Sequence, residues 1–383
     1  MKLLSEEQAM MLRAETPPGL VCYTPPASPL TTPPALEIPE RIAKLAQDFI
    51  DGSFDSGSWI FSESGGAVST KGSQNFIYAF NDQVHIVVNH SQSGETSYAY
   101  RNLKIAMARI EHIVSEEHPA TLDILAFILL ETMYFQNTSA VAFSLLRQFS
   151  AMSAVILPKR HPFNQVFARL VRLDMSHLKY TLIMARESQS DGFARRLGRF
   201  NWSTLQILVS SLELKSIEGA THTTEGYLTL LQAVELVLDT FDPRLIFVRN
   251  HLAQHYFREG EFTKAAETAQ NIIDLAAQTG NVQPHTHARA LYMLSLAHHT
   301  LSKTISAEQN LRQAIHIQGT SYGWEDGCVL GYMSVLEYWL EGWERPDEAA
   351  EVRRQREEIL DSMEEKIDRE EEERCQRLGI TEA

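Results

Sequence analysis

Histidine and cysteine are two of the residue types in this 383-residue chain that could hold a metal ion or act in catalysis. His285 and His287 lie near the start of an expected helix, where a spacing of two turns their side chains about 200° apart, so they cannot share one metal ion. His298 and His299 are adjacent. No cysteine accompanies either pair at zinc-type spacing, because the three cysteines are far apart: Cys22, Cys328 and Cys375. The pattern predicts no metal site and no cofactor.

Motifs of the common enzyme classes are missing from the sequence. Gly65-Gly66 and Thr70-Lys71-Gly72 lack the spacing of a phosphate-binding loop, and no G-x-S-x-G elbow or H-E-x-x-H pair occurs. His118 and His161 each precede a proline at an expected helix start, where we expect them to help cap the helix. The sequence therefore predicts no catalytic residue. An unrecognised all-helical enzyme is the alternative, which a closed pocket with two or more perturbed carboxylates would favour.

A regular spacing of small residues indicates how the chain is built. Three alanines that are each expected to open the second helix of a pair lie 42 residues apart: Ala265, Ala307 and Ala349. A second marker keeps nearly the same period just inside each expected first helix: Pro119, Pro162, Trp202, Pro243 and Pro284. Proline suits that position, since its missing N–H has no acceptor in the first turn. Two agreeing registers indicate a helical repeat array.

The clearest unit spans Leu252 to Ala269 and has the tetratricopeptide order of small and large residues. Ala253 and Ala265 let two antiparallel helices approach closely, and Gly260 lies in the turn between them. Ala99 and Ala142 take the corresponding places in earlier units, whereas the pairs at about 160–198 and 201–239 keep the period and lose the small residues. The sequence predicts an all-α, tetratricopeptide-like α-solenoid, a right-handed superhelix of about seven helix pairs with a period of about 42.

Composition divides the chain into four predicted segments. They are a disordered Pro/Ser/Thr-rich arm at 1–37, a short helix with an ordered Gly/Ser/aromatic loop at 38–75, the repeat domain at 76–343 and an acidic capping helix at 344–383. The aromatics Phe54, Trp59 and Phe61 are expected to hold the loop against the first repeat. Four Ser/Thr-Pro dipeptides suit proline-directed kinases, although proline-rich linkers carry such pairs without regulation: Thr16, Thr24, Ser28 and Thr32.

The final helix has a narrow apolar stripe at Ile359, Met363 and Ile367. We interpret it as a solvated cap for the open end of the solenoid, which repeat arrays need for solubility. A coiled contact with a helix of another protein is the alternative.

The formal net charge of −15 argues against a general nucleic-acid binder. A modest basic cluster is interpreted as a solvated helix face, and it includes Arg172, Arg186, Arg195 and Arg196. No signal-peptide-like start and no run of about 18 apolar residues occurs. We expect an intracellular protein, nuclear or cytoplasmic, that does not enter a membrane.

The inner face of the first helices is the predicted partner-binding surface. In a tetratricopeptide array these helices line the concave side, and counting from Ala265 places Asn250 and Gln254 there, with Tyr292 and His299 one repeat later. Amides bond both N–H and C=O groups of an extended peptide, and an aromatic ring adds contact area. Ordinary half-exposed helix residues would give the same pattern. The predicted partner is a protein or peptide.

Several segments resemble the C-terminal region of a family of filamentous-fungal proteins in which an N-terminal cryptic-loci-regulator domain, the fifth of its series, precedes helical repeats. The stretches that carry the resemblance are 24–29, 52–59, 68–72, 118–122 and 145–152 running on to His161-Pro162. The basic, tryptophan-containing N-terminal domain of that family has no counterpart in the sequence. The resemblance implies a regulatory subunit in fungal chromatin or transcriptional control. Residues 118–122 and the period are also similar to kinesin-light-chain-type repeats, which bind peptides.

Overall fold

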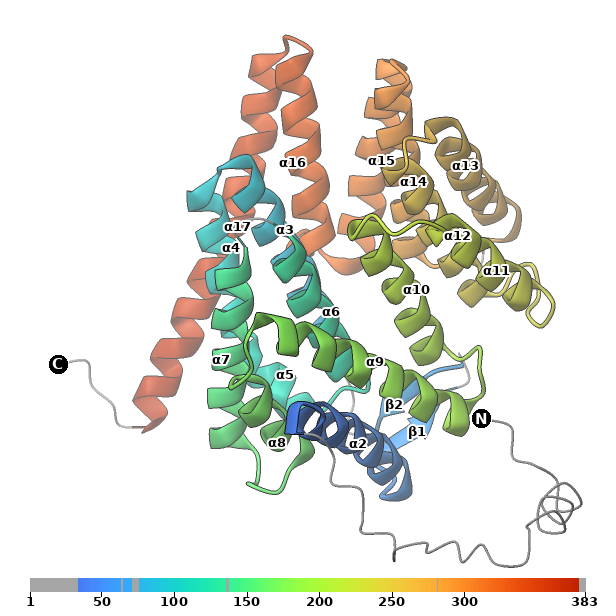
Figure 1. Cartoon of the computed structure of the whole chain (residues 1–383). Helices are drawn as coiled ribbons and strands as arrows, with labels where there is room; N and C mark the ends of the chain where they lie inside the picture. Colours follow the sequence, from blue (N-terminus) through green and yellow to red (C-terminus); the bar gives the residue numbers. More distant parts are fainter. Residues whose placement is uncertain (1–33, 63–64, 71–75, 136–137, 281, 379–383) are drawn as a thin grey trace, which may run out of the picture. The chain divides into compact units, whose positions relative to one another are not determined.

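A computed structural model describes residues 34–62, 65–70, 76–135, 138–280 and 282–378 (Figure 1). Most of the predicted arm, with Thr16, Thr24, Ser28 and Thr32, lies outside the described residues. Its last four residues do not belong to an arm, because helix α2 (Pro34–Asp55) already begins at Pro34.

The described chain is predominantly helical, and its helices follow one another in the sequence as seven consecutive pairs, six of which pack directly together, which confirms the predicted fold class (Figure 1). The pairs are α3 (Phe76–Ser93) with α4 (Thr96–Ala108), α6 (Thr121–Tyr134) with α7 (Ser139–Ile156), α8 (Pro162–Leu170) with α9 (Met175–Leu197), α10 (Trp202–Ile217) with α11 (Thr223–Glu235), α12 (Pro243–Arg258) with α13 (Phe262–Thr279), α14 (Pro284–Thr300) with α15 (Thr304–Tyr322), and α16 (Gly327–Gly342) with α17 (Pro346–Leu378). A short helix, α5 (Ile110–Glu116), separates α4 from α6.

The predicted marker residues open the first helices. Helices α8, α10, α12 and α14 begin at Pro162, Trp202, Pro243 and Pro284. His161 caps α8 as expected, because its Nδ1 accepts the backbone N–H of Phe163 at 3.2 Å. Pro119 differs: α6 begins two residues later, at Thr121, and His118 Nδ1 instead accepts the backbone N–H of Ala120 in the turn before it.

A small residue recurs at the fourth position of most second helices. The alanines at this position are all buried, as is Ala253 on α12: Ala99, Ala142, Ala265, Ala307 and Ala349. Helix α11 has Gly226 there, and a Cβ at that position would lie 2.7 Å from the side chain of Leu212. This pair therefore keeps a small residue, contrary to the expectation from sequence. In α9 the place is taken by Leu178, and this helix packs on α6 and α10 rather than on α8, so among the described residues no close α8–α9 contact requires a small residue there.

The predicted loop after α2 contains two short strands. β1 (Trp59–Phe61) and β2 (Ala67–Ser69) pair antiparallel, with Ile60 opposite Val68. Trp59 is buried as expected, with its ring 5.0 Å from that of Phe49. Phe61 is exposed and holds nothing in place.

The β1–β2 hairpin has other contacts than the predicted ones with the first repeat. The Trp59 ring stacks on Phe193 of α9, and the backbone N–H of Trp202 donates to the carbonyl oxygen of Gly65 at 2.9 Å. Trp59 therefore anchors this segment to α9, whose buried apolar surface suits its ring, while its Nε1 donates to the carbonyl oxygen of Glu117 at the end of α5, at 3.0 Å.

Helix α7 is long and apolar enough to cross a membrane by length and composition alone. In the structure one face of this helix is buried against its neighbours, with Leu145, Leu146 and Phe149 in the core. Core helices and membrane spans pass the same test, and only 28% of this window is buried, so burial of one face accounts for part of the apolar character of α7.

The last helix pair contacts the first. Helix α16 packs against α3, and α17 packs against α4. One apolar cluster joins all four helices, and it contains Ile86, Ile105, Leu330, Leu360 and Met363. Around it, Arg101 of α4 donates to Glu364 at 3.0 Å, and Lys104 to Asp368 at 2.8 Å.

The prediction that α17 is a solvated cap is therefore wrong for its apolar stripe. Its predicted stripe is covered from within the chain, since Met363 is buried and both Ile359 and Ile367 pack against the same cluster. Acidic side chains beside this stripe form ion pairs with basic residues of α4. These ion pairs help so acidic a helix to pack against α4.

Candidate binding site

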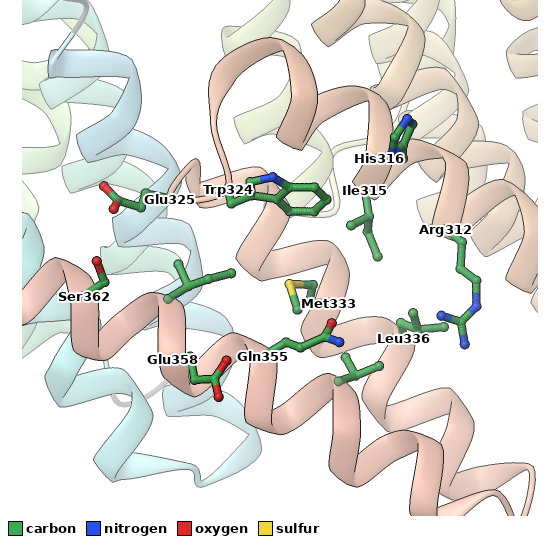
Figure 2. Close-up of a pocket in the computed structure, with 12 residues that line it drawn as sticks. Arg312, Ile315, His316, Trp324, Glu325, Met333, Leu336, Gln355, Glu358 and Ser362 are labelled. Atoms are coloured by element: carbon green, nitrogen blue, oxygen red, sulfur yellow. The ribbon is translucent and has the colours of Figure 1, made fainter.

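An apolar cavity of about 570 Å³ lies between α15, α16 and α17 (Figure 2). Its apolar lining comes from all three helices and from the turn between α15 and α16: Ile315, Trp324, Met333, Leu336, Val352 and Ile359. The polar lining residues are Arg312, His316, Glu325, Gln355, Glu358 and Ser362. A cavity of this volume with an apolar floor and few polar groups is typical of a binding pocket.

Trp324 forms one wall of the cavity and is held there by a glycine. A Cβ on Gly319 of α15 would lie 2.8 Å from the indole ring of Trp324, so the ring rests directly on the helix backbone. The side chain is nevertheless 48% exposed. An aromatic ring fixed on one side and open on the other offers contact area at a small cost in conformational entropy.

The ends of the cavity carry opposite charge. Figure 2 shows Arg312 and His316 toward one end and Glu325, Glu358 and Ser362 toward the other. Arg312 pairs with Glu308 of its own helix at 2.8 Å, and Glu358 pairs with Arg354. The Arg354–Glu358 pair is exposed and contributes little free energy, so an incoming basic group can replace Arg354 in it.

The predicted partner-binding residues lie on α12 and α14, where each contacts a neighbouring helix. Asn250 is buried, and its Nδ2 donates to the carbonyl oxygen of Thr286 at 3.1 Å. Tyr292 stacks on Tyr332 of α16, with 4.4 Å between ring centroids, and burial raises its pKa to about 12. His299 stacks on Trp339 of α16 at 4.2 Å.

Gln254 belongs to a polar network that connects α10, α12 and α14. Its Nε2 donates to Glu213 at 3.1 Å, and its Oε1 accepts from Arg289 at 2.5 Å. Burial disfavours the charged form of Glu213, but Arg258 and His251 outweigh it and lower the pKa of this carboxyl to about 2. All four predicted residues thus connect neighbouring repeats; that they also touch a partner stays a prediction.

The pKa of His85, a residue of helix α3, is well above the usual range for histidine. His85 of α3 lies 3.0 Å from Glu131 of α6. Burial opposes its charged form, but Glu131, with smaller effects from Glu213 and Asp82, raises the pKa of His85 to about 9. The ion pair therefore stabilises the fold fully below the unfolded pKa of about 6.5, and this contribution disappears as the pH rises through about 9.

We expect the imidazole resonances of His85 to titrate near pH 9 when followed by NMR. Replacing Glu131 by Gln removes the main charge that favours the imidazolium, so the pKa of His85 should fall, because burial is then opposed only by the smaller effects of Glu213 and Asp82. Glu95→Gln, which removes the exposed partner of His90 on the same helix, is the control and should leave His85 unchanged. A pKa that stays near 9 in Glu131→Gln would contradict the assignment.

The carboxylates do not support the enzyme alternative. Burial and the nearby Asp82 raise the pKa of Asp326, and the pKa of Glu213 is lowered, but neither residue lines the cavity. The two acidic groups that do line it, Glu325 and Glu358, pair with Lys366 and Arg354.

No family model matches the sequence, and no curated protein matches it. Among solved structures, the chain is similar to two crystal structures of nearly identical TPR-like repeats from a putative kinesin light chain of Podosopora anserina. One is of a variant with a single substitution and has 16% identity and a TM-score of 0.33, and the other has 17% identity and a TM-score of 0.31. Each match covers 65% of this chain and 98% of the other.

At such identities and TM-scores the two neighbours carry no argument about function, and the fold class rests on the chain's own helix pairs. The resemblance to the cryptic-loci-regulator family finds no support in these comparisons, and the implied role in chromatin or transcription stays a prediction.

Proposed function

We propose that this chain is a non-catalytic scaffold that binds a short segment of another protein in the cavity between α15 and α17. The observation that carries the proposal is the cavity itself, because the side chains of the described residues leave its apolar floor unfilled. Apolar surface of this kind is stabilised when an apolar side chain covers it.

The geometry favours an extended segment. The cavity runs along α17 from Val352 to Ser362, and the ten helical steps between these residues span about 15 Å at the rise of an α-helix. A segment of about four or five extended residues has that length. Apolar side chains at its centre would contact Met333 and Trp324.

The charges at the two ends favour one direction for that segment. An acidic group or a terminal carboxylate suits the end with Arg312, and a basic group suits the end with Glu358. A peptide with the opposite polarity would place like charges together and should bind more weakly.

Selection from a random peptide-display library tests the proposal without knowledge of the natural partner. We expect wild-type protein to enrich peptides with a central apolar pair flanked by charges of opposite sign. A synthetic peptide of the enriched sequence should change the fluorescence of Trp324, since the bound peptide excludes water from the exposed face of the indole ring. Trp324→Ala should weaken binding by about tenfold or more, the loss expected for a central aromatic contact.

Tyr338→Ala is the matched control, because Tyr338 is an exposed aromatic residue of α16 that does not line the cavity. It should leave the affinity unchanged. Enrichment that is equally strong with Trp324→Ala, or an equal loss in both variants, would place the binding surface elsewhere.

A further inference from the structure

Three potential metal ligands meet where the first and last helix pairs touch. They are Asp82 of α3, Asp326 immediately before α16, and Cys328 in the first turn of α16. One ligand atom of each lies within 4.8 Å of the others. All three residues are half-buried, unlike the scattered acidic groups on the surface of the chain.

A glycine brings the backbones together at this place. A Cβ on Gly327 would lie 2.6 Å from the Cβ of Asp82 and 3.3 Å from its carbonyl carbon, so only a glycine fits between α16 and α3. The two other ligands directly flank this glycine in the sequence. Asp326 also caps α16, because its Oδ1 accepts the backbone N–H of Cys328 at 3.0 Å. The relative positions of the three groups are therefore set by backbone contacts.

The side-chain amide of Gln318, buried beside the cluster, has an oxygen without a hydrogen-bond partner. Gln318 of α15 is 1% exposed, and its Nε2 lies 3.0 Å from Oδ1 of Asp326 and 3.2 Å from Nδ1 of His285. Its Oε1 has no hydrogen-bond partner. An unpaired oxygen buried this deeply is costly, and rotation of the amide by about 180° would turn it toward Asp326. A cation bound at Asp326 would favour that orientation.

The charges around the cluster leave room for a cation. In the described part of the chain, neither Asp82 nor Asp326 has a basic group within ion-pair distance. The guanidinium of Arg109 interacts with both carboxylates electrostatically from a greater distance, and its Nη1 has no hydrogen-bond partner among the described residues. Two carboxylates that lie this close together in a half-buried site repel each other, and a positive charge in contact with both would stabilise their ionised forms.

We propose that Asp82, Asp326 and Cys328 bind one divalent metal ion of the zinc class. A thiolate with two carboxylates suits zinc, which binds sulfur at about 2.3 Å and oxygen at about 2.0–2.2 Å. Zinc displaces the proton of the Cys328 thiol, which passes to solvent as the metal–sulfur bond forms. Water or Oε1 of Gln318 occupies the fourth position. The ion joins α3 to α16 and so fastens the last helix pair to the first.

Cobalt provides a direct test, because a bound thiolate gives Co²⁺ an intense charge-transfer absorption in the near ultraviolet. Metal-free wild-type protein titrated with Co²⁺ should develop this band to one equivalent, and Zn²⁺ should abolish it by displacement. Cys328→Ser should lose the band and bind Zn²⁺ at least about tenfold more weakly. Cys375→Ser is the matched control and should behave as wild type.

A second readout needs no variant. Zn²⁺ should protect Cys328 of the wild-type protein from alkylation, as located by mass spectrometry, and should raise the Tm of the wild-type protein. Absence of both the cobalt band and the protection in wild-type protein overturns the proposal. A band that persists in Cys328→Ser and disappears in Cys375→Ser overturns it as well.

Discussion

Ala265→Arg should lower the free energy of unfolding by about 3–5 kcal/mol, measured by urea denaturation. Ala265 is fully buried near the start of α13, a helix that packs closely on both α12 and α14. An arginine there must push helices apart to make room, and it also brings a charge into a buried helix contact.

Glu371→Ala provides the comparison, since Glu371 lies exposed on α17. Changes at such positions usually shift stability by no more than about 0.5 kcal/mol. Equal shifts of the unfolding midpoint in the two variants would show that the repeat register, and with it the small-residue position, has been assigned wrongly.

Arg186→Met should cost a similar amount, about 3–5 kcal/mol, through electrostatics rather than packing. Arg186 of α9 donates to Asp123 of α6 at 2.7 Å, and both side chains are almost fully buried. Its guanidinium also donates to the carbonyl oxygen of Ile207 on α10 at 3.3 Å and to Ser210. Removing the arginine leaves the carboxylate of Asp123 buried without a counter-charge.

Two further variants separate this cause from a general loss of volume. Arg195→Met makes the same change on the same helix at an exposed position and should shift stability by about 0.5 kcal/mol or less. The double variant Asp123→Asn with Arg186→Met should recover a substantial part of the loss, because no charge is then left uncompensated. A double variant as unstable as the sum of the two singles would rule out this explanation.

The repeat architecture was predictable from the sequence because close helix contacts permit few residue types. A buried alanine at 265, 307 and 349 and a proline at 162, 243 and 284 each answer a local steric requirement, and that requirement recurs in most pairs. The pair at α10 and α11 is harder to recognise because its small residue is Gly226, which fills the same place without matching an alanine pattern.

Contacts between distant parts of the chain leave no such signal. Arg186 lies in a basic cluster whose pattern favours a solvated face, and only the fold shows that Asp123, 63 positions earlier, is buried against it. Asp82 is likewise separated from Asp326 by the whole array, so no ligand spacing could reveal the cluster. The cavity beside Trp324 depends on an α15–α17 contact that helical periodicity does not specify.

The contact of α16 and α17 with α3 and α4 changes how the molecule can come apart. In an open array each terminal repeat has a neighbour on one side only, so it unfolds first and the rest follows by fraying. Here, within the described residues, the terminal pairs are neighbours of each other, and opening either one breaks packing on two sides. Loss of any single pair then weakens both of its neighbours, and the array is expected to unfold as one cooperative unit rather than from its ends.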